Sequence, residues 1–367
     1  EANPFKNLGM DNPNGSQRYY IGHVNWTGFN GLMEYTGSDK FSAVLQFGTS
    51  SQDYQWEGFY TAAPDTKSRV VTVNGGYIKG GANYRANDNS NFFFNVGQIM
   101  RPPSFDGVFP NADYDFEEAD EILNESFTSF ELGYGFRSSN FKGTINAYHT
   151  VWGDRTLRRS TSIDDQGVRI IYSGVEQTHQ GIEGEMTWYP SNRLRIKGMF
   201  SLGDWKYTKN FQGDAYFIDN NQPAGTTGTL YLDGVKIGDA AQTVFYLGFD
   251  YKLSSKLSVD LDMMRYDNLH GRFGPLDSEF NSDNNRGSIK LPSWGTADLG
   301  ATYSFNLLGY DARARLNVNN LFDEEYLSQS QTNFHNDGGR TWNGVNVENN
   351  VYFGKGTTWN LGLNIRF

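Results

Sequence analysis

The last eleven residues, Thr357 to Phe367, constrain the fold of this chain more than any other stretch. A strand directs successive side chains to opposite faces, so their strict alternation predicts a β-strand with one apolar and one polar face. That apolar face would meet a second sheet in a soluble sandwich, or lipid in an outer-membrane barrel. The terminal strand alone leaves both open, but its aromatic last residue and the recurrence of the pattern along the chain favour the barrel. The alternating apolar residues are Trp359, Leu361, Leu363, Ile365 and Phe367.

Composition narrows the class of protein. The mean hydropathy is −0.61 and no apolar run approaches about eighteen residues, which excludes a transmembrane helix. Aromatic residues make up 16% of the chain, and 42 Gly stand against 10 Pro, as is typical of barrels with a narrow lipid-facing band. The lack of Cys excludes a disulfide scaffold and a thiolate metal site. A net charge of −11 argues against nucleic acid as a partner.

Alternating runs recur through the sequence and predict an all-β fold. We expect an antiparallel transmembrane β-barrel to which this chain contributes about thirteen strands. The predicted strands are 29–35, 41–47, 70–84, 92–100, 130–136, 141–147, 181–189, 194–202, 245–251, 257–263, 297–305, 312–318 and 357–367.

The connections between these strands alternate in length. Short turns are expected at 37–39, 87–90, 138–140, 190–192, 253–256 and 306–310, and long connections at 51–68, 101–126, 153–180, 206–240, 267–292 and 323–356. Outer-membrane barrels have this asymmetry, with short turns in the periplasm and long loops outside. An odd number of antiparallel strands cannot close a barrel, and an open edge is not tolerated in lipid. We therefore expect residues 1–367 to be the C-terminal part of a larger barrel, with the missing strands upstream or in another chain. Glu1 to Gly9 lack signal-peptide features, so we expect the signal peptide outside the given sequence, removed by processing or by truncation.

Several segments resemble TonB-dependent outer-membrane receptors, in the order found in that family. Arg315 to Tyr326 is similar to the signature of their penultimate strand, and two Gly-rich segments, 80–84 and 133–138, resemble the Bacteroidota branch. The other matching segments are Met100 to Phe105, Asn124 to Tyr134 and Gly181 to Trp188.

The resemblance implies a nutrient importer in the outer membrane. Its barrel would have 22 strands around an N-terminal plug, and this chain would supply the tenth to the twenty-second. The TonB–ExbB–ExbD complex would pull on a plug that lies upstream, the BAM machinery would assemble the barrel, and outer-membrane lipids would surround it. Residues 336–340 differ from the last-loop element of the starch-utilisation subgroup, which argues against a glycan and against a surface lipoprotein lid. The residues of the family motif and of barrel assembly would be Asn319, Asn320, Leu321, Phe322, Asp323, Tyr326 and Phe367.

Ligand contacts are expected in the long external loops, because these combine aromatic, amide and charged side chains. A siderophore, vitamin, oligosaccharide or peptide would all suit such loops, and a surface lipoprotein remains a candidate partner. We expect neither a cofactor nor a metal site. The candidate ligand-binding residues are Arg101, Phe105, Asp113, Asp115, Trp205, Arg272, Arg340 and Trp342.

Each motif also has a purely structural interpretation. Asn319, Asn320 and Asp323 are expected to bond to the backbone where a strand ends. The acidic loop 111–121 lacks the Gly and Glu of an EF-hand at its sixth and twelfth places, so it is interpreted as a solvated loop. Stacking on a sugar is the alternative to an interfacial belt for the tryptophans. The tryptophans expected in interfacial belts are Trp152, Trp188, Trp205, Trp294 and Trp359.

Three functional classes remain open at this stage. The first is a TonB-dependent active importer, the second a passive porin-like channel, and the third a barrel that serves as a structural or assembly subunit. The motifs favour the importer, and nothing in the sequence supplies the catalytic constellation of an enzyme.

Overall fold

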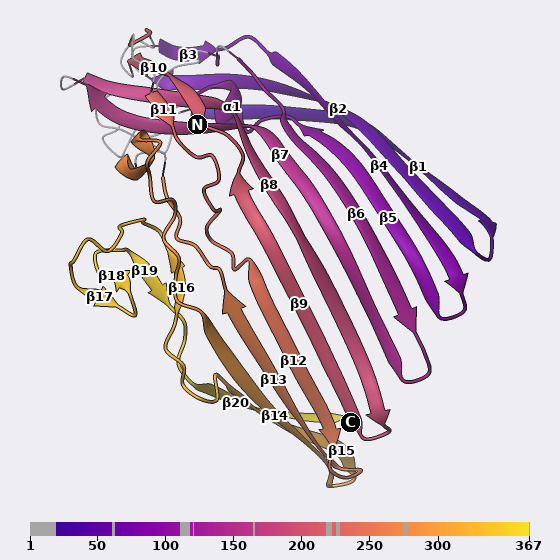
Figure 1. Ribbon diagram of the computed structural model, residues 1–367. Helices are drawn as coiled ribbons and strands as arrows, with labels where there is room; N and C mark the ends of the chain where they lie inside the picture. The colour runs from indigo at the N-terminus through magenta and orange to yellow at the C-terminus, as the bar shows by residue number, and fades with distance from the viewer. Residues whose placement is uncertain are drawn as a thin grey trace.

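One antiparallel sheet dominates the computed structural model, which describes residues 20–60, 63–110, 118–119, 121–163, 166–217, 222–224, 228–274 and 277–366. Its thirteen principal strands lie side by side in chain order, as Figure 1 shows. The prediction of thirteen antiparallel strands is therefore confirmed. They are β1 (Tyr20–Ser38), β2 (Phe41–Tyr60), β4 (Val71–Asn87), β5 (Ser90–Arg101), β6 (Glu125–Arg137), β7 (Phe141–Ile163), β8 (Gln166–Ser191), β9 (Leu194–Tyr207), β12 (Thr243–Lys252), β13 (Leu257–Asp267), β14 (Trp294–Leu307), β15 (Tyr310–Asn319) and β20 (Thr358–Arg366).

The sheet has one apolar and one polar face, because the register keeps the alternation of neighbouring strands in phase. Leu361 of β20 lies opposite Leu316 of β15, which lies opposite Ala301 of β14. The same row continues to Val259 of β13 and Tyr251 of β12. A side chain such as Leu361 is 67% exposed on this face. The apolar face thus extends as a band across the whole width of the sheet.

The two ends of the sheet differ (Figure 1). Six tight hairpins lie at one end, which we call the turn end, and they join β1 to β2, β4 to β5, β6 to β7, β8 to β9, β12 to β13 and β14 to β15. All long connections lie at the opposite loop end. Within the described ranges, β1 and β20 pair with one neighbour each, so they form the two open edges of the sheet. None of the helices in these ranges is long and apolar enough to cross a membrane.

Two of the predicted loops are wrong, because they are extended strands. Residues 153–180 were expected to form a long connection, but β7 and β8 continue there as a paired hairpin. Similarly, β2 runs on to Tyr60 through the expected loop 51–68. The reason is tertiary packing: Val168, Ile170 and Tyr172 of β8 are buried against other loop segments instead of continuing the apolar band.

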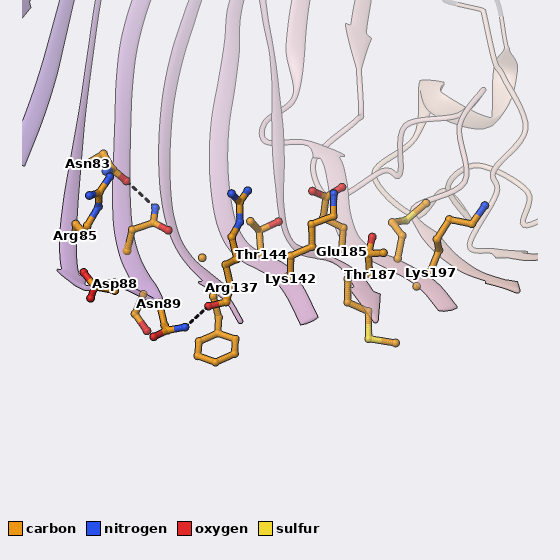
Figure 2. A pocket seen from close by; sticks show the side chains of 18 of the residues that line it. Asn83, Arg85, Asp88, Asn89, Arg137, Lys142, Thr144, Glu185, Thr187 and Lys197 are labelled. Atoms are coloured by element: carbon orange, nitrogen blue, oxygen red, sulfur yellow. Dashed lines mark hydrogen bonds between the residues drawn. The ribbon is translucent and has the colours of Figure 1, made fainter. Parts of the chain in front are cut away.

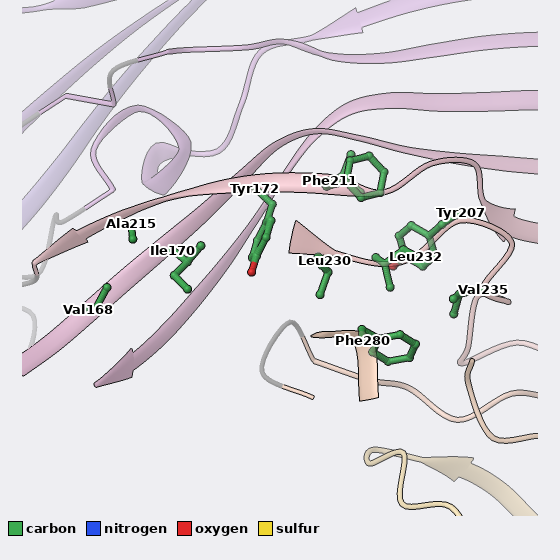
Figure 3. Close-up of a cluster of buried hydrophobic side chains, with 11 residues drawn as sticks. Val168, Ile170, Tyr172, Tyr207, Phe211, Ala215, Leu230, Leu232, Val235 and Phe280 are labelled. Carbon is green, nitrogen blue, oxygen red and sulfur yellow. The ribbon is translucent and has the colours of Figure 1, made fainter. Parts of the chain in front are cut away.

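The loop end contains short elements that pack into cores of their own. Figure 3 shows one of these cores, in which β8, β10, β11 and η2 bring buried apolar side chains together. A second surrounds Trp56 and Val108, and a third surrounds Leu291 and Leu327. The loops are therefore packed structures with defined positions for their side chains. The short elements are β3 (Ala63–Lys67), α1 (Phe105–Val108), β10 (Phe211–Phe217), β11 (Gly228–Leu230), η2 (Ser278–Asn281), β16 (Leu327–Ser330), β17 (Thr341–Trp342), β18 (Val345–Asn346) and β19 (Val351–Phe353).

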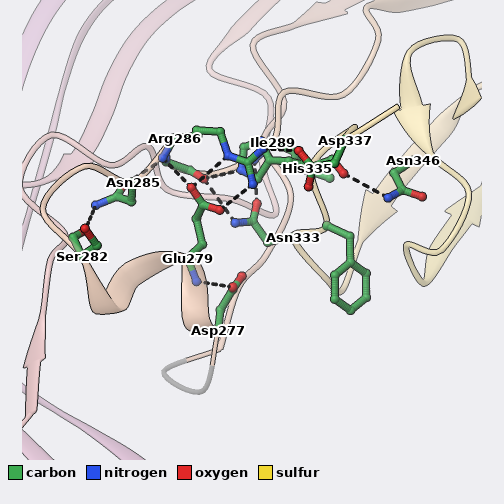
Figure 4. A network of polar contacts seen from close by, with 12 residues as sticks. Asp277, Glu279, Ser282, Asn285, Arg286, Ile289, Asn333, His335, Asp337 and Asn346 are labelled. Carbon is green, nitrogen blue, oxygen red and sulfur yellow. Dashed lines mark hydrogen bonds and ion pairs between the residues drawn. The ribbon is translucent and has the colours of Figure 1, made fainter. Parts of the chain in front are cut away.

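A polar network joins the β13–β14 loop to the last long loop (Figure 4). The Arg286 guanidinium contacts the Glu279 carboxylate at 2.8 Å and the Asp337 carboxylate at 2.6 Å. The side-chain bond from Arg286 lowers the pKa of Glu279 to about 2. The Asn333 Oδ1 atom accepts from the backbone N–H of Ile289 at 2.7 Å, which adds a second tie between the two loops.

Candidate functional site

The polar face is hollowed near the turn end. This hollow, of about 780 Å³, is lined by residues from β4 to β12, so the sheet must curve toward its polar side there. Figure 2 shows its polar side chains in a row across the strands, with Asn83 accepting from Asn91 at 2.6 Å. Charged residues of both signs line it, namely Arg85, Asp88, Arg137, Lys142, Glu185 and Lys197.

Further along the polar face, ion pairs connect β9, β12 and β13. Lys197 contacts Asp250 at 3.5 Å and Asp262 at 3.3 Å, while Arg195 contacts Asp250 at 2.8 Å. Each of these side chains comes from a polar position of its strand, so the strand alternation itself brings them together.

A further ion pair on the polar face, between β13 and β15, is bidentate. The Arg315 guanidinium of β15 reaches across β14 and donates to both oxygens of Asp260, at 2.8 and 2.9 Å. Two parallel N–H bonds fix both side chains in one geometry. The ion-paired residues of β9, β12, β13 and β15 thus form a charged wall on the polar face. Its charges and hydrogen bonds suit a surface in contact with water.

At the loop end, the polar face carries a row of aromatic and cationic side chains. The Arg101 guanidinium lies 5.5 Å from the ring centre of Phe127, and this ring stacks on Trp152 at 5.0 Å. The Arg155 guanidinium covers the Trp152 ring at 3.8 Å. Glu125 forms an ion pair with Arg101 and accepts from the Trp152 indole N–H at 3.3 Å.

A neighbouring row extends this arrangement onto β8 and β9. The rings of His179 and Trp205 lie 5.6 Å apart, on directly paired residues. The indole N–H of Trp205 donates to the Tyr148 hydroxyl at 2.8 Å, which orients the ring. We call Arg101, Phe127, Trp152, Arg155, His179 and Trp205 the loop-end ladder.

The loop-end ladder combines ring faces with guanidinium groups. Rings stack on planar groups, while guanidinium groups bind carboxylates or other anionic oxygens through paired N–H bonds. Trp152, His179 and Trp205 are each partly exposed, and Arg101 is exposed. This arrangement is suited to a planar, anionic organic ligand. Among the described residues, no group of His, Asp and Glu side chains is arranged to hold a metal ion.

The structure brings two of the predicted ligand-binding residues, Arg101 and Trp205, into the loop-end ladder. Arg101 lies on β5 and Trp205 on β9, and both side chains point to the polar face. Phe127, Trp152, Arg155 and His179 of the ladder were not among the predicted ligand-binding residues. The alternation of apolar and polar residues could have revealed two of them, since Phe127 and Trp152 are aromatic residues at polar-face positions of their strands.

The other predicted ligand-binding residues are dispersed. Phe105 of α1 stacks on Tyr20 at 5.8 Å and lies against the core around Trp56. Trp342 packs edge-on against Phe353 at 5.2 Å. Arg272 lies 3.8 Å from Asp239, and Arg340 is exposed in the last long loop. Asp113 and Asp115 lie outside the described residues.

The motif after β15 forms a tightly bonded strand end. The Asn320 side chain accepts from the Glu324 N–H at 2.9 Å and donates to the Glu324 and Lys355 carbonyls at 2.9 and 3.1 Å. Asp323 accepts from the Thr357 N–H at 2.8 Å. These bonds anchor both ends of the last long loop.

The rest of the motif frames this strand end. The Tyr326 ring stacks on Trp294 at 3.8 Å, and the Leu321 N–H donates to the Ala297 carbonyl at 2.7 Å. Asn319 bonds to the Thr358 hydroxyl at 3.2 Å, and Phe322 is 78% exposed. Phe367 lies outside the described residues.

The expected tryptophan belts are only partly correct. Trp188 and Trp359 do lie exposed on the apolar face. Trp152, Trp205 and Trp294 instead occupy polar-face positions, so the belt interpretation is wrong for these three. Tryptophan type alone cannot tell the two faces apart, whereas the register of the strand does.

Comparison with known proteins decides the family. The model of the TonB dependent receptor-like β-barrel family matches residues 3–321. The chain belongs to this family. No curated protein sequence matches the chain significantly.

Solved structures of TonB-dependent receptors share the fold of the sheet. The siderophore receptor PiuA from Acinetobacter baumannii matches 94% of the chain with a TM-score of 0.66 and 13% identity. The ferric-catecholate import receptor Fiu from E. coli K12 matches 95% with a TM-score of 0.60 and 16% identity. The ferric yersiniabactin uptake receptor FyuA from Yersinia pestis matches 95%, with a TM-score of 0.59 and 13% identity. The chain spans 43%, 45% and 47% of these three proteins, so it corresponds to less than half of each.

Proposed function

We propose that this chain forms the C-terminal part of the barrel of an outer-membrane TonB-dependent receptor that imports a scarce nutrient. The family match over residues 3–321 carries this proposal. In such a barrel, the apolar face contacts lipid, the turn end lies in the periplasm, and the long loops face outside. The open edges at β1 and β20 pair with further strands, to a total of 22.

The proposed partners follow from this arrangement. An upstream plug fills the lumen against the charged wall and couples it to the TonB–ExbB–ExbD complex. The BAM machinery inserts the barrel, and a surface lipoprotein is a further partner. The Gly-rich segments 80–84 and 133–138 support an origin in the Bacteroidota. The role is transport without catalysis.

The ligand binds at the loop-end ladder in this proposal. Its residues face the lumen at the mouth of the barrel, above the space that a plug would occupy. The solved relatives include receptors named for siderophores, and a siderophore fits the stacking and guanidinium groups of the ladder. Other planar anionic nutrients fit the same groups.

Uptake by whole cells tests the importer directly. The small molecules left in spent medium would be compared by mass spectrometry for wild-type cells, a strain without this gene and a strain without tonB. We expect the same molecules to remain in both mutant cultures, and the intact gene to restore uptake only where TonB is present. Uptake that continues without TonB would show a passive channel and refute the proposal.

Substitutions in the loop-end ladder test the position of the site. Trp152→Ala and Arg155→Gln should each weaken uptake of that molecule about tenfold, the loss expected for a stacked ring or a charge-assisted bond. Trp188→Ala, on the apolar face, is the matched control and should leave uptake unchanged. Wild-type uptake by both ladder variants would exclude this surface as the ligand site.

A further inference from the structure

A cluster of basic side chains lies on the outside of the sheet, directly beyond the apolar band at the loop end. On β9, Leu202 is the last apolar residue of this face, and Asp204 and Lys206 follow at the next two positions of the same face. On β13, Arg265 follows Met263 in the same way. We call Lys206, Lys236, Arg265 and Lys290 the outer basic patch.

Backbone pairing holds this patch together. Lys206 pairs with Lys236, and His270 pairs with Lys290, each through an isolated antiparallel bridge. The Ser288 hydroxyl donates to the Lys236 carbonyl at 2.9 Å and so links the two bridges. The four basic side chains therefore come from four segments, namely β9, the β9–β12 connection, β13 and the β13–β14 connection, and hydrogen bonds link these segments to one another.

The patch has an excess of positive charge. Two carboxylates face it: Asp204 contacts Lys206 at 3.3 Å and also pairs with Lys236, while Asp267 contacts Lys290 at 2.9 Å. Arg265 donates to the Ser293 hydroxyl at 2.5 Å, and this neutral partner does not offset its positive charge. Four cations against two carboxylates give a net charge of about +2 before His270 is counted.

The patch is accessible, because the side chains of Lys206, Lys236 and Lys290 are 38%, 37% and 50% exposed. Strands β1, β2 and β4 to β8 lack this charge. On each of them, the two positions that follow the apolar band on this face carry no Lys or Arg. These residues are Asn25 and Thr27 on β1, Thr49 and Ser51 on β2, Asn74 and Gly76 on β4, Gln98 and Met100 on β5, Ser126 and Thr128 on β6, His149 and Val151 on β7, and Thr178 and Gln180 on β8.

We propose that the outer basic patch binds the phosphate groups of an outer-leaflet glycolipid of the lipid A type. Such a molecule has anionic phosphates directly above its acyl chains. The protein has the complementary order, with basic residues directly above apolar Leu202, Phe245 and Met263. A free phosphate ion would use the charges but not the apolar band. The proposal requires that the apolar face contacts outer-membrane lipid, as in the proposed function, but it does not require transport.

Native mass spectrometry of the full-length protein in detergent tests this site. The probe is diphosphoryl lipid A, titrated against wild type and against the triple variant Lys206→Gln, Arg265→Gln, Lys290→Gln. Each basic residue near a lipid surface changes binding by roughly fivefold, so the triple variant should bind about a hundredfold more weakly. The Lys236 pair with Asp204 remains intact in this variant, which preserves the fold of the loop.

Two controls separate the site from general charge and from misfolding. Lys256→Gln removes one charge at the turn end and should leave binding unchanged. The double variant Lys206→Arg, Lys290→Arg keeps the charges and should bind like wild type. Equal lipid A binding by wild type and the triple variant would overturn the proposal.

Two further arms identify the ligand chemistry. The wild-type protein should bind lipid A without phosphates only weakly, at the level at which the triple variant binds diphosphoryl lipid A. Inorganic phosphate at millimolar concentration should not displace diphosphoryl lipid A from the wild-type protein. Tight binding of the phosphate-free lipid, or displacement by inorganic phosphate, would refute a phosphorylated headgroup as the specific ligand. Failure of TonB-dependent uptake would leave these binding results unaffected, so the two proposals fail separately.

Discussion

A single charge on either face of β20 tests which face contacts lipid. Leu361 is 67% exposed on the apolar face, one strand position from Asn360, which points to the polar face. Arginine on the lipid face of a barrel costs about 2–4 kcal/mol at the bilayer midplane and less toward the interfaces. Leu361 lies two residues, or about 7 Å, inward from Trp359 along the strand. We therefore expect Leu361→Arg to cost roughly 2–3 kcal/mol.

Asn360→Arg is the matched control, because it introduces the same side chain into the same strand. It removes one bond, from the Asn317 amide at 2.8 Å, which is worth about 1 kcal/mol. Urea unfolding of the full-length protein from lipid vesicles, followed by tryptophan fluorescence, measures both variants. Equal destabilisation, or a larger loss for Asn360→Arg, would refute the assignment of the two faces.

Two further predictions concern the last long loop. Asn320→Ala should lower the free energy of unfolding by about 1–3 kcal/mol, because it removes three hydrogen bonds from the buried Asn320 side chain to backbone groups of Glu324 and Lys355, whereas Asn319→Ala should have little effect; urea midpoints would check both. The lowered pKa of Glu279 means that its pairing with Arg286 stabilises the loops fully above pH about 4.5 and is lost as the pH falls through about 2. Hydrogen exchange of residues 277–290, corrected for intrinsic rates, should therefore rise only below pH about 4.5 in wild type. In Glu279→Gln, it should be raised already at neutral pH, and a pH-independent wild type would contradict the role of this pair.

Much of the fold was predictable because membrane strands obey a local rule. Alternation with period two predicts both the strand and its two faces, and the tight turns follow where two alternating runs nearly meet. The thirteen strands and their order could therefore be predicted. The loop end followed no such rule, since β7 and β8 extend beyond the apolar band and are stabilised there by contacts with β10, β11 and η2.

The candidate site shows the same division. Arg101 and Trp205 could be selected by residue type and position, but the aromatic residues Phe105 and Trp342, selected on the same grounds, pack against buried cores instead. Trp152 appeared to be a belt residue until the register placed it on the polar face beside Phe127 and Arg155. Which side chains meet depends on contacts across strands, and these contacts are not encoded by spacing along one strand.

The sequence by itself determined the family, the all-β class, the apolar and polar faces, and the asymmetry of turns and loops, because each is written in short-range patterns. Only the tertiary structure decided which loop residues pack and which remain accessible. It also brought Lys206 beside Lys236, and Lys290 beside His270. These residues are far apart in the chain, and hydrogen bonding across the loop end places their charges together above the apolar band.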